Sequence, residues 1–162
     1  MDRLPAGQAP DEGVAMARIV VGIDGSDHAR RALMWAVEEA RLRGATLAVT
    51  YVAVAPEAST PGLAPPGPTA HELATMGREL VVDEALAQVD TDDLAVERVT
   101  LPGQPAEVLC GLATDADMLV VGARGLGGLR GLLLGSVTQQ VISHAPCPVA
   151  VVVPNQVTSP TG

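Results

Sequence analysis

Aromatic side chains are almost absent from this 162-residue chain, which contains one Trp, one Tyr and no Phe. Apolar residues still make up 48% of the sequence, so a hydrophobic core has to consist of Val, Leu, Ile and Ala. Such aliphatic cores are typical of parallel sheets that are buried on both faces. The length suits one domain of ordinary size.

Cysteine is also scarce, and the two thiols have no spacing that suggests a site. Cys110 and Cys147 form no CxxC motif. The three histidines, His28, His71 and His144, have no Cys or carboxylate at a metal-ligand spacing. We therefore expect reduced, packed thiols without a redox role, and no metal centre built from His and Cys.

Positive charge and long apolar runs are both in short supply. Ten basic residues against 19 acidic ones give a formal net charge of −9, which argues against nucleic acid as a partner because phosphate backbones select basic surfaces. No apolar run approaches the roughly 20 residues that span a bilayer. The first 17 residues also lack the apolar run of a signal peptide. We expect a cytoplasmic protein that binds neither membrane nor nucleic acid.

Short apolar runs and amphipathic stretches alternate along the chain. The runs, several of them rich in β-branched residues, predict five strands at about 19–23, 45–54, 94–101, 118–123 and 149–154. Helical spacing of apolar residues, with Pro or Ser at a helix start, predicts four helices at 27–43, 70–87, 105–114 and 136–144. This alternation predicts right-handed crossovers and an open parallel α/β sheet with helices on both faces.

For two of these elements the sequence predicts more detail. The third predicted strand contains Glu97 and Arg98, and this polarity favours the edge of the sheet. In the helix before it, the residues expected to face the core are Leu73, Met76, Leu80 and Val81.

Three segments lack the patterning of regular structure. Residues 1–16 are expected to form a disordered N-terminal tail, and residues 155–162 a frayed C-terminal tail. The Pro- and Gly-rich segment 55–69 is expected to be a mobile surface loop. The predicted domain therefore covers residues 17–154.

The stretch GARGLGGLRGLLLGS, from Gly122 to Ser136, follows the fourth predicted strand. It is rich in glycine and contains two arginines, Arg124 and Arg130, but no acidic residue. Glycines allow a tight exit from a strand and let a ligand touch bare backbone. The helix expected from Ser136 presents free N–H groups that favour an anion. The stretch therefore suggests a phosphate-binding loop, although its glycines alone would equally suit a solvent-exposed loop.

Two familiar phosphate motifs are excluded for this loop. No Lys precedes Ser136, as a Walker A motif requires, and no GxGxxG follows the first strand. In open parallel sheets, ligands bind past the carboxyl ends of the strands where the chain order reverses. If the first and fourth strands are neighbours there, Asp24-Gly25-Ser26 and the Gly122 loop meet.

The stretches IVVGIDGS and VVGARGLGGLRGLLLGSVTQQVISHAPCPVAVV resemble the universal stress protein family, and the likeness covers roughly residues 18–153. The family's ATP-binding pattern, G-x2-G-x9-G-(S/T), is matched in full by Gly122, Gly125, Gly135 and Ser136. The resemblance implies a Rossmann-like open five-stranded parallel sheet of order 3-2-1-4-5. It also implies a homodimer, with the last strand at the dimer contact.

The resemblance also implies roles for individual residues. Asp24 would lie near the ribose and phosphates, and the backbone of Val52 would meet adenine, with Ala53 a weaker match. The family often has His where this chain has Tyr51. The expected nucleotide-binding residues are Asp24, Gly25, Val52, Gly122, Arg124, Gly125, Gly135, Ser136 and Val137.

Asp24 and Ser136 each have a plainer explanation beside the ligand role. Asp24 could be a turn aspartate that caps the following helix, and Ser136 could be an N-cap. A carboxylate that faces a triphosphate repels it unless a cation lies between them. If Asp24 lies beside the phosphates, we therefore expect Mg²⁺ or Mn²⁺ to bind together with ATP.

We expect an ATP-binding, nucleotide-dependent stress-response regulator that acts through dimer and protein-partner surfaces. Three alternatives stay open. The chain could be a slow ATP hydrolase in which Asp24 orients water, because no general base or Walker lysine is evident for faster turnover. It could bind cAMP in place of ATP. A nucleotide-free scaffold is the third alternative, and the complete loop pattern argues against it.

Overall fold

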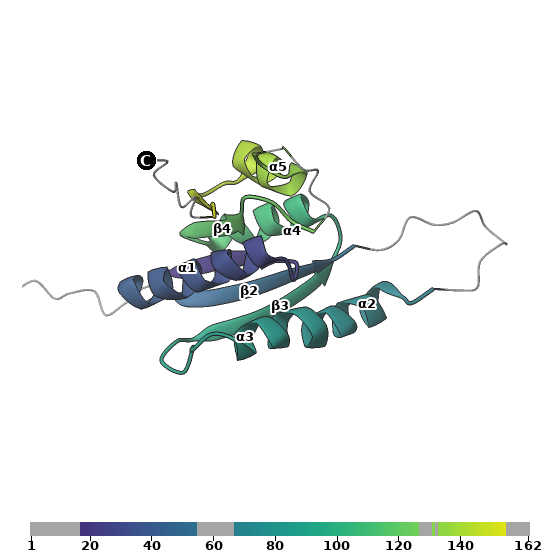
Figure 1. The fold of residues 1–162 in the computed structure, drawn as a ribbon, viewed down its shortest axis with the longest axis horizontal. Helices are drawn as coiled ribbons and strands as arrows, with labels where there is room; N and C mark the ends of the chain where they lie inside the picture. Colours follow the sequence, from purple (N-terminus) through teal and green to yellow (C-terminus); the bar gives the residue numbers. More distant parts are fainter. Residues whose placement is uncertain (1–16, 55–66, 127–130, 132, 155–162) are drawn as a thin grey trace, which may run out of the picture.

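Five parallel strands form a sheet in the order β3-β2-β1-β4-β5 (Figure 1). The strands are β1 (Arg18–Ile23), β2 (Thr46–Ala53), β3 (Val96–Pro102), β4 (Met118–Gly122) and β5 (Val149–Val152). The computed structural model describes residues 17–54, 67–126, 131 and 133–154. The expected tails, most of the 55–69 loop and part of the Gly122 loop lie outside these described residues. The sheet order confirms the expectation, with polar β3 at one edge and β1 beside β4.

Helices cover both faces of this sheet. They are α1 (Asp27–Arg43), α2 (Ala70–Gly77), α3 (Glu84–Ala87), α4 (Pro105–Leu112) and α5 (Ser136–His144). A π-helical turn, Arg78–Asp83, joins α2 to α3, and a 3₁₀ turn, Ala113–Asp115, follows α4. One core cluster packs α1, the π-helical turn and α3 on one face, and another packs α4 and α5 on the opposite face. Within the described residues, every helix is too short or too polar to span a bilayer.

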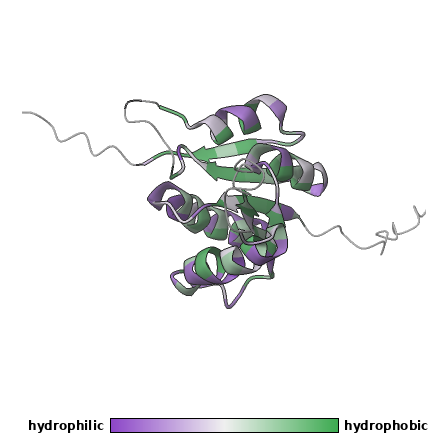
Figure 2. Cartoon of the chain, turned by 90° about the vertical axis from the view of Figure 1, so that its right-hand side faces the viewer, coloured by the Kyte–Doolittle hydropathy of each residue, from purple (hydrophilic) through white to green (hydrophobic). Residues whose placement is uncertain are grey.

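The strands at the centre of the sheet are almost wholly apolar, whereas the helices are apolar on one side only (Figure 2). Ile19, Val20 and Val21 are successive residues of β1 that point to alternate faces, and all three are fully buried. Burial of each such aliphatic side chain stabilises the fold by about 1.5–3 kcal/mol. The aliphatic core expected from the lack of aromatics is therefore divided between the two faces.

Helix α1 begins and ends at the expected residues for identifiable reasons. The Ser26 hydroxyl accepts a hydrogen bond from the N–H of Ala29 at 3.1 Å, which caps the start of the helix. Gly44 ends it in a left-handed conformation, with φ of 60°. The buried stripe consists of Ala29, Ala32, Leu33, Ala36, Val37 and Ala40.

The expected inward face of the second helical segment is wrong in part. Met76 and Leu80 are 51% and 63% exposed, whereas Gly77 and Val82 are buried. The reason lies at Gly77, because a Cβ there would collide with the ring of Tyr51. The helix approaches the sheet through its glycine, so its buried face is rotated away from the larger apolar residues.

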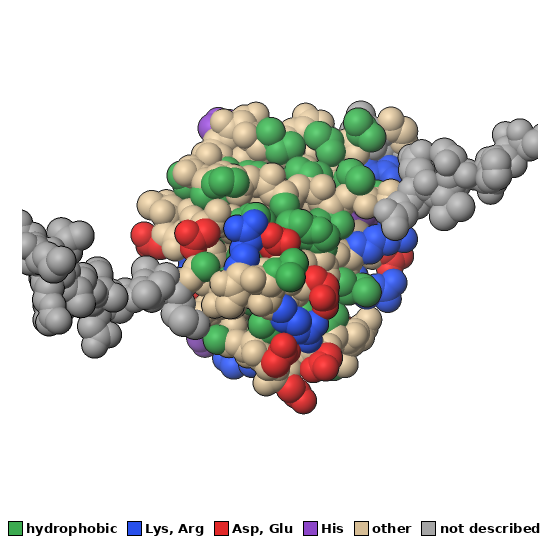
Figure 3. Space-filling view, turned by 90° about the vertical axis from the view of Figure 1, so that its left-hand side faces the viewer, with side chains coloured by type: hydrophobic (Ala, Val, Ile, Leu, Met, Phe, Trp, Pro, Cys, Tyr) green, Lys and Arg blue, Asp and Glu red, His purple; other side chains and the backbone are tan. Residues whose placement is uncertain are grey.

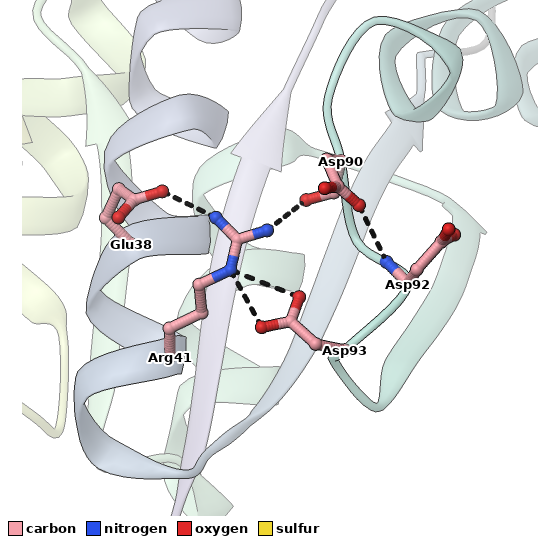
Figure 4. Close-up of polar contacts among 5 residues, drawn as sticks. All are labelled: Glu38, Arg41, Asp90, Asp92 and Asp93. Carbon is pink, nitrogen blue, oxygen red and sulfur yellow. Dashed lines mark hydrogen bonds and ion pairs between the residues drawn. The ribbon is translucent and has the colours of Figure 1, made fainter.

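Arg41, in the last turn of α1, holds this helix to the turn that precedes β3 (Figure 4). Its Nε donates to the two carboxylate oxygens of Asp93 at 3.1 and 3.0 Å, and its other nitrogens donate to Glu38 and to the carbonyl of Asp90, each at 2.6 Å. Asp92 contributes its backbone N–H to Asp90 at 3.1 Å. Around this end of the molecule, acidic and basic side chains are interspersed (Figure 3).

This ion pair predicts a pH-dependent contribution to stability. The hydrogen bond from Arg41 lowers the pKa of Asp93 below its ordinary value of 3.8. A carboxyl whose pKa is depressed by folding stabilises the protein above that ordinary value and loses the effect as the pH falls through the depressed one. We expect Asp93→Asn to melt a few degrees below wild type at pH 7, with the gap closing towards pH 3.

Thermal denaturation followed by circular dichroism at pH 7, 5 and 3 measures the gap. The matched control is Asp92→Asn, because Asp92 uses its backbone and not its carboxylate in this cluster. A melting-temperature gap for Asp93→Asn that stays constant across the three pH values would contradict the prediction.

Candidate functional site

A cavity of about 570 Å³ opens beyond the carboxyl ends of β1, β2 and β4. It lies where the chain order reverses between β1 and β4, which is the usual ligand position in open parallel sheets. Its lining comes from the turn after β1, the loop after β4, the start of α5, the end of β2 and the start of α4.

Asp24 joins the turn after β1 to the loop after β4. One carboxylate oxygen accepts the N–H of Ser26 at 2.9 Å, and the other accepts the N–H of Leu126 at 3.0 Å. A Cβ at Gly125 would collide with this carboxylate. Glycine at position 125 is therefore what lets the loop pass so close to Asp24. The Asp24 side chain therefore both stabilises the turn after β1 and lies at the cavity wall.

The N-terminus of α5 forms the next part of this wall. Its N-cap is Gly135, and among the described residues no side chain caps the helix. Ser136 is the first helical residue, so the alternative in which Ser136 is the N-cap is wrong. The N–H of Gly135 donates to Ala123 at 2.8 Å, and the Thr138 hydroxyl donates to Gly122 at 2.8 Å. These two bonds fix the start of α5 beside the end of β4, with its positive dipole end and with N–H groups that have no partner inside the helix.

The lining residues from β2 and α4 are mainly apolar, as is Val137 at the start of α5. Val52 contributes from β2, and Pro105 and Leu109 contribute from α4. Pro105 and Leu109 were not expected at the site from the sequence.

One signal in the sequence could have identified Leu109. Gly22 interrupts the apolar run of β1, and glycine inside a strand often marks a close approach. A Cβ at Gly22 would lie 2.8 Å from Leu109, which packs over it.

All the expected nucleotide-binding residues except Gly25 line this cavity. Gly25 has a φ of 86° and shapes the turn after β1 without forming part of the wall. Arg130 lies outside the described residues. The wall residues that the sequence analysis did not name as binding residues include Gly22, Thr50, Tyr51, Pro105, Leu109 and Thr138.

The formal charges of the described lining residues balance. Arg124 and Asp24 are the charged side chains among the described lining residues. No group of three or more His, Cys, Asp or Glu in the described residues is arranged to hold a metal ion. A divalent cation at Asp24 would therefore need further oxygen ligands from a bound molecule, as phosphates provide.

Both cysteines lie outside the lining of the cavity. Cys110 and Cys147 pack partly buried against the core cluster beneath α4 and α5. Burial raises the pKa of both thiols, and the nearby Cys110 raises that of Cys147 further. Thiols with raised pKa values are poor nucleophiles at neutral pH.

A second hollow of about 450 Å³ lies at the start of α2, with Gly67, Pro68, Thr75 and Met76 in its wall. Its carboxylate, Glu72, is already committed to a capping box with Thr69. We assign this hollow no binding role.

The family model of the universal stress protein family matches residues 16–153 of the chain. A universal stress protein of Thermus aquaticus is 38% identical over 140 residues, covering 83% of this chain and 96% of the relative. One from Mycolicibacterium smegmatis is 36% identical over 137 residues, which cover 84% of this chain and 45% of the relative. The chain thus spans about half the length of several mycobacterial relatives that it matches.

Solved structures with the same fold include nucleotide complexes. Universal stress protein UspA from Lactobacillus plantarum superposes with a TM-score of 0.67 at 26% identity, covering 84% of this chain and 97% of that one. A universal stress protein in complex with cAMP gives a TM-score of 0.56 at 31% identity, covering 84% and 95%. One from Archaeoglobus fulgidus in complex with dAMP gives 0.58 at 27%, covering 84% and 96%.

Proposed function

This chain belongs to the universal stress protein family, and from that premise we propose that it binds ATP and acts as a nucleotide-dependent regulator in the stress response. The observation that carries the proposal is the convergence of Asp24, Gly125 and the start of α5 on one cavity. The relatives solved with cAMP and with dAMP support an adenine nucleotide as the ligand class.

The lining of the cavity suggests how a nucleotide would lie. An adenine ring suits its apolar part, formed by Val52, Leu109 and Val137. Phosphates suit the polar part of the lining, because the N–H groups at the start of α5 and the guanidinium of Arg124 favour anions there. Asp24 belongs to this polar part and would face the ribose or a phosphate-bound Mg²⁺ or Mn²⁺.

Ser136→Ala tests the phosphate side of this site. The Ser136 side chain is exposed and caps no helix, so its removal should leave stability unchanged. Loss of one hydroxyl donor to a charged phosphate should weaken ATP binding about five- to tenfold. Isothermal titration calorimetry with ATP, ADP and cAMP, with and without Mg²⁺, measures the effect.

Ser143→Ala is the matched control, because Ser143 is exposed at the far end of the same helix. Wild type without measurable affinity for any of the three nucleotides would refute the proposed function. Equal ATP affinity in wild type and Ser136→Ala would remove the Ser136 hydroxyl from the site. Competition between cAMP and ATP in one titration decides which of the two is preferred, since cAMP carries a single phosphate charge and depends less on Arg124.

Hydrolysis of ATP is a weaker candidate than binding. Asp24 is the carboxylate among the described lining residues, and both of its oxygens already accept backbone hydrogen bonds. A carboxylate held in this way is a poor general base. We propose a binding protein whose ATP turnover, where present, is slow.

We also propose that the chain forms a homodimer through β5 and works in the cytoplasm. β5 is an edge strand, its four residues are partly exposed, and Val153 beyond it is exposed. An exposed apolar edge favours pairing with a second strand. Sedimentation velocity of the purified chain measures its assembly state. A regulator would also present a second surface, separate from the dimer contact, to a protein partner.

A further inference from the structure

Two polar side chains are buried in the described parts of the chain, Thr50 and Thr138, and both line the cavity. Their hydrogen bonds differ sharply. The Thr138 hydroxyl donates to the carbonyl of Gly122 at 2.8 Å. The Thr50 hydroxyl has a contact of 3.5 Å to the carbonyl of Ala48 in its own strand, which is at the outer limit for a hydrogen bond. Thr50 is therefore a buried hydroxyl without a good partner.

The position of Thr50 in β2 places it at the apolar end of the cavity. Side chains alternate along a strand, so Thr50 faces the same side as Ala48 and Val52. The residue opposite it in β1 is Gly22, which has no side chain, and Leu109 packs over that glycine. Thr50 thus lies on the sheet face that Leu109 covers, next to Val52, where we propose that the base binds.

We propose that Thr50 determines base recognition at this site, with its hydroxyl donating a hydrogen bond to a ring nitrogen of the bound purine. This inference rests on the proposed function. Hydroxyl hydrogens rotate freely about the C–O bond, so the group exchanges its long contact with Ala48 for a bond to the ligand. When a buried hydroxyl obtains its hydrogen-bond partner from the ligand, the site prefers ligands that supply such a partner.

A purely structural role for Thr50 predicts a different result. Threonine is common in strands for its β-branched shape, and valine has that same shape without the hydroxyl. Thr50→Val should leave the melting temperature unchanged or higher, because it removes a poorly bonded buried hydroxyl. The same variant should bind the purine nucleoside about tenfold more weakly, whereas a shape-only role predicts unchanged binding.

The experiment compares wild type, Thr50→Val, Thr50→Ser and Ser136→Ala with two probes. Adenosine carries the base without phosphates and is titrated by NMR, and ATP with Mg²⁺ is titrated by calorimetry. We expect Thr50→Val to weaken the binding of adenosine and of ATP by the same factor of about ten. Thr50→Ser keeps the hydroxyl and should restore most of the affinity. Ser136→Ala should weaken ATP more than adenosine.

Each other outcome overturns the inference. Unchanged affinity in Thr50→Val removes the hydroxyl from recognition, and equal losses in the Val and Ser variants assign the effect to packing. A loss of affinity for ATP without a loss of affinity for adenosine places Thr50 at the phosphate end of the site. If wild type binds neither probe, the proposed function fails together with this inference. If wild type binds both and Thr50→Val binds equally well, this inference alone fails.

Discussion

Gly122→Ala is expected to unfold readily, or not to fold, even though alanine differs from glycine by one methyl group. A Cβ at Gly122 would lie 2.8 Å from both the carbonyl carbon and the carbonyl oxygen of His28. These atoms belong to the backbone of the first turn of α1, so they cannot move aside as a side-chain tip can. Overpacking of this kind costs about 1–3 kcal/mol and more where backbone must shift, which is a large part of the roughly 5–15 kcal/mol that stabilises a typical domain.

Gly135→Ala is the matched comparison. Gly135 has a φ of −73°, which alanine adopts without strain. The nearest atom to its Cβ would be the Cα of Arg124 at 3.3 Å, a tight but tolerable contact. We expect a loss of less than about 1 kcal/mol.

Urea denaturation of both variants without nucleotide measures the difference. Equal stability of Gly122→Ala and wild type would contradict the packing argument. The expected result means that the first and third glycines of the loop pattern act differently. Lost nucleotide binding in Gly122→Ala would report a disturbed fold, so binding studies need variants such as Ser136→Ala.

Asp24→Asn is expected to change ATP affinity in opposite directions with and without Mg²⁺. The Asp24 carboxylate lies beside Gly125, in the part of the cavity that we propose for the phosphates. Without a cation, this negative charge repels a triphosphate, so its removal should raise the affinity about tenfold. With Mg²⁺, the carboxylate attracts the ion, and its removal should lower the affinity by a similar factor.

Calorimetric titration of ATP in Mg²⁺ and in a chelator gives the four affinities. Asp27→Asn is the control, because Asp27 is an exposed carboxylate three residues along the chain and pairs with Arg30 at the surface. A purely long-range charge effect would appear in both variants. Changes of the same sign in both conditions would refute the metal-linked role of Asp24. The melting temperature of Asp24→Asn is measured in parallel, since an amide cannot accept from both Ser26 and Leu126.

The sequence predicted most element boundaries because these depend on local signals. The run of Ile19, Val20 and Val21 is apolar at every position, which is typical of a strand covered on both faces. Ser26 and Gly44 bracket α1 with the residue types that cap helices. The resemblance supplied the strand order, which periodicity alone does not determine.

The parts that were wrong or missed depend on contacts between distant segments. The inward face of the second helical segment is decided by the packing of Tyr51 on Gly77, and nothing near Met76 or Leu80 in the sequence records this contact. Likewise, Pro105 and Leu109 enter the cavity wall because α4 crosses the end of β1 and β2. Their role depends on how the chain packs and not on a pattern within α4.

Because aromatic residues are scarce in this chain, a single tyrosine beside the cavity can serve as an intrinsic fluorescence probe. Tyr51 is the one tyrosine of the chain; it lies at the end of β2 beside the cavity, and its ring packs against Gly77. Trp35 is the one tryptophan, and it lies partly exposed on α1 and outside the cavity lining. Replacement of Trp35 by Phe would leave a protein whose ultraviolet emission comes from Tyr51 alone. Quenching of that emission would report ligand entry in real time without an attached dye.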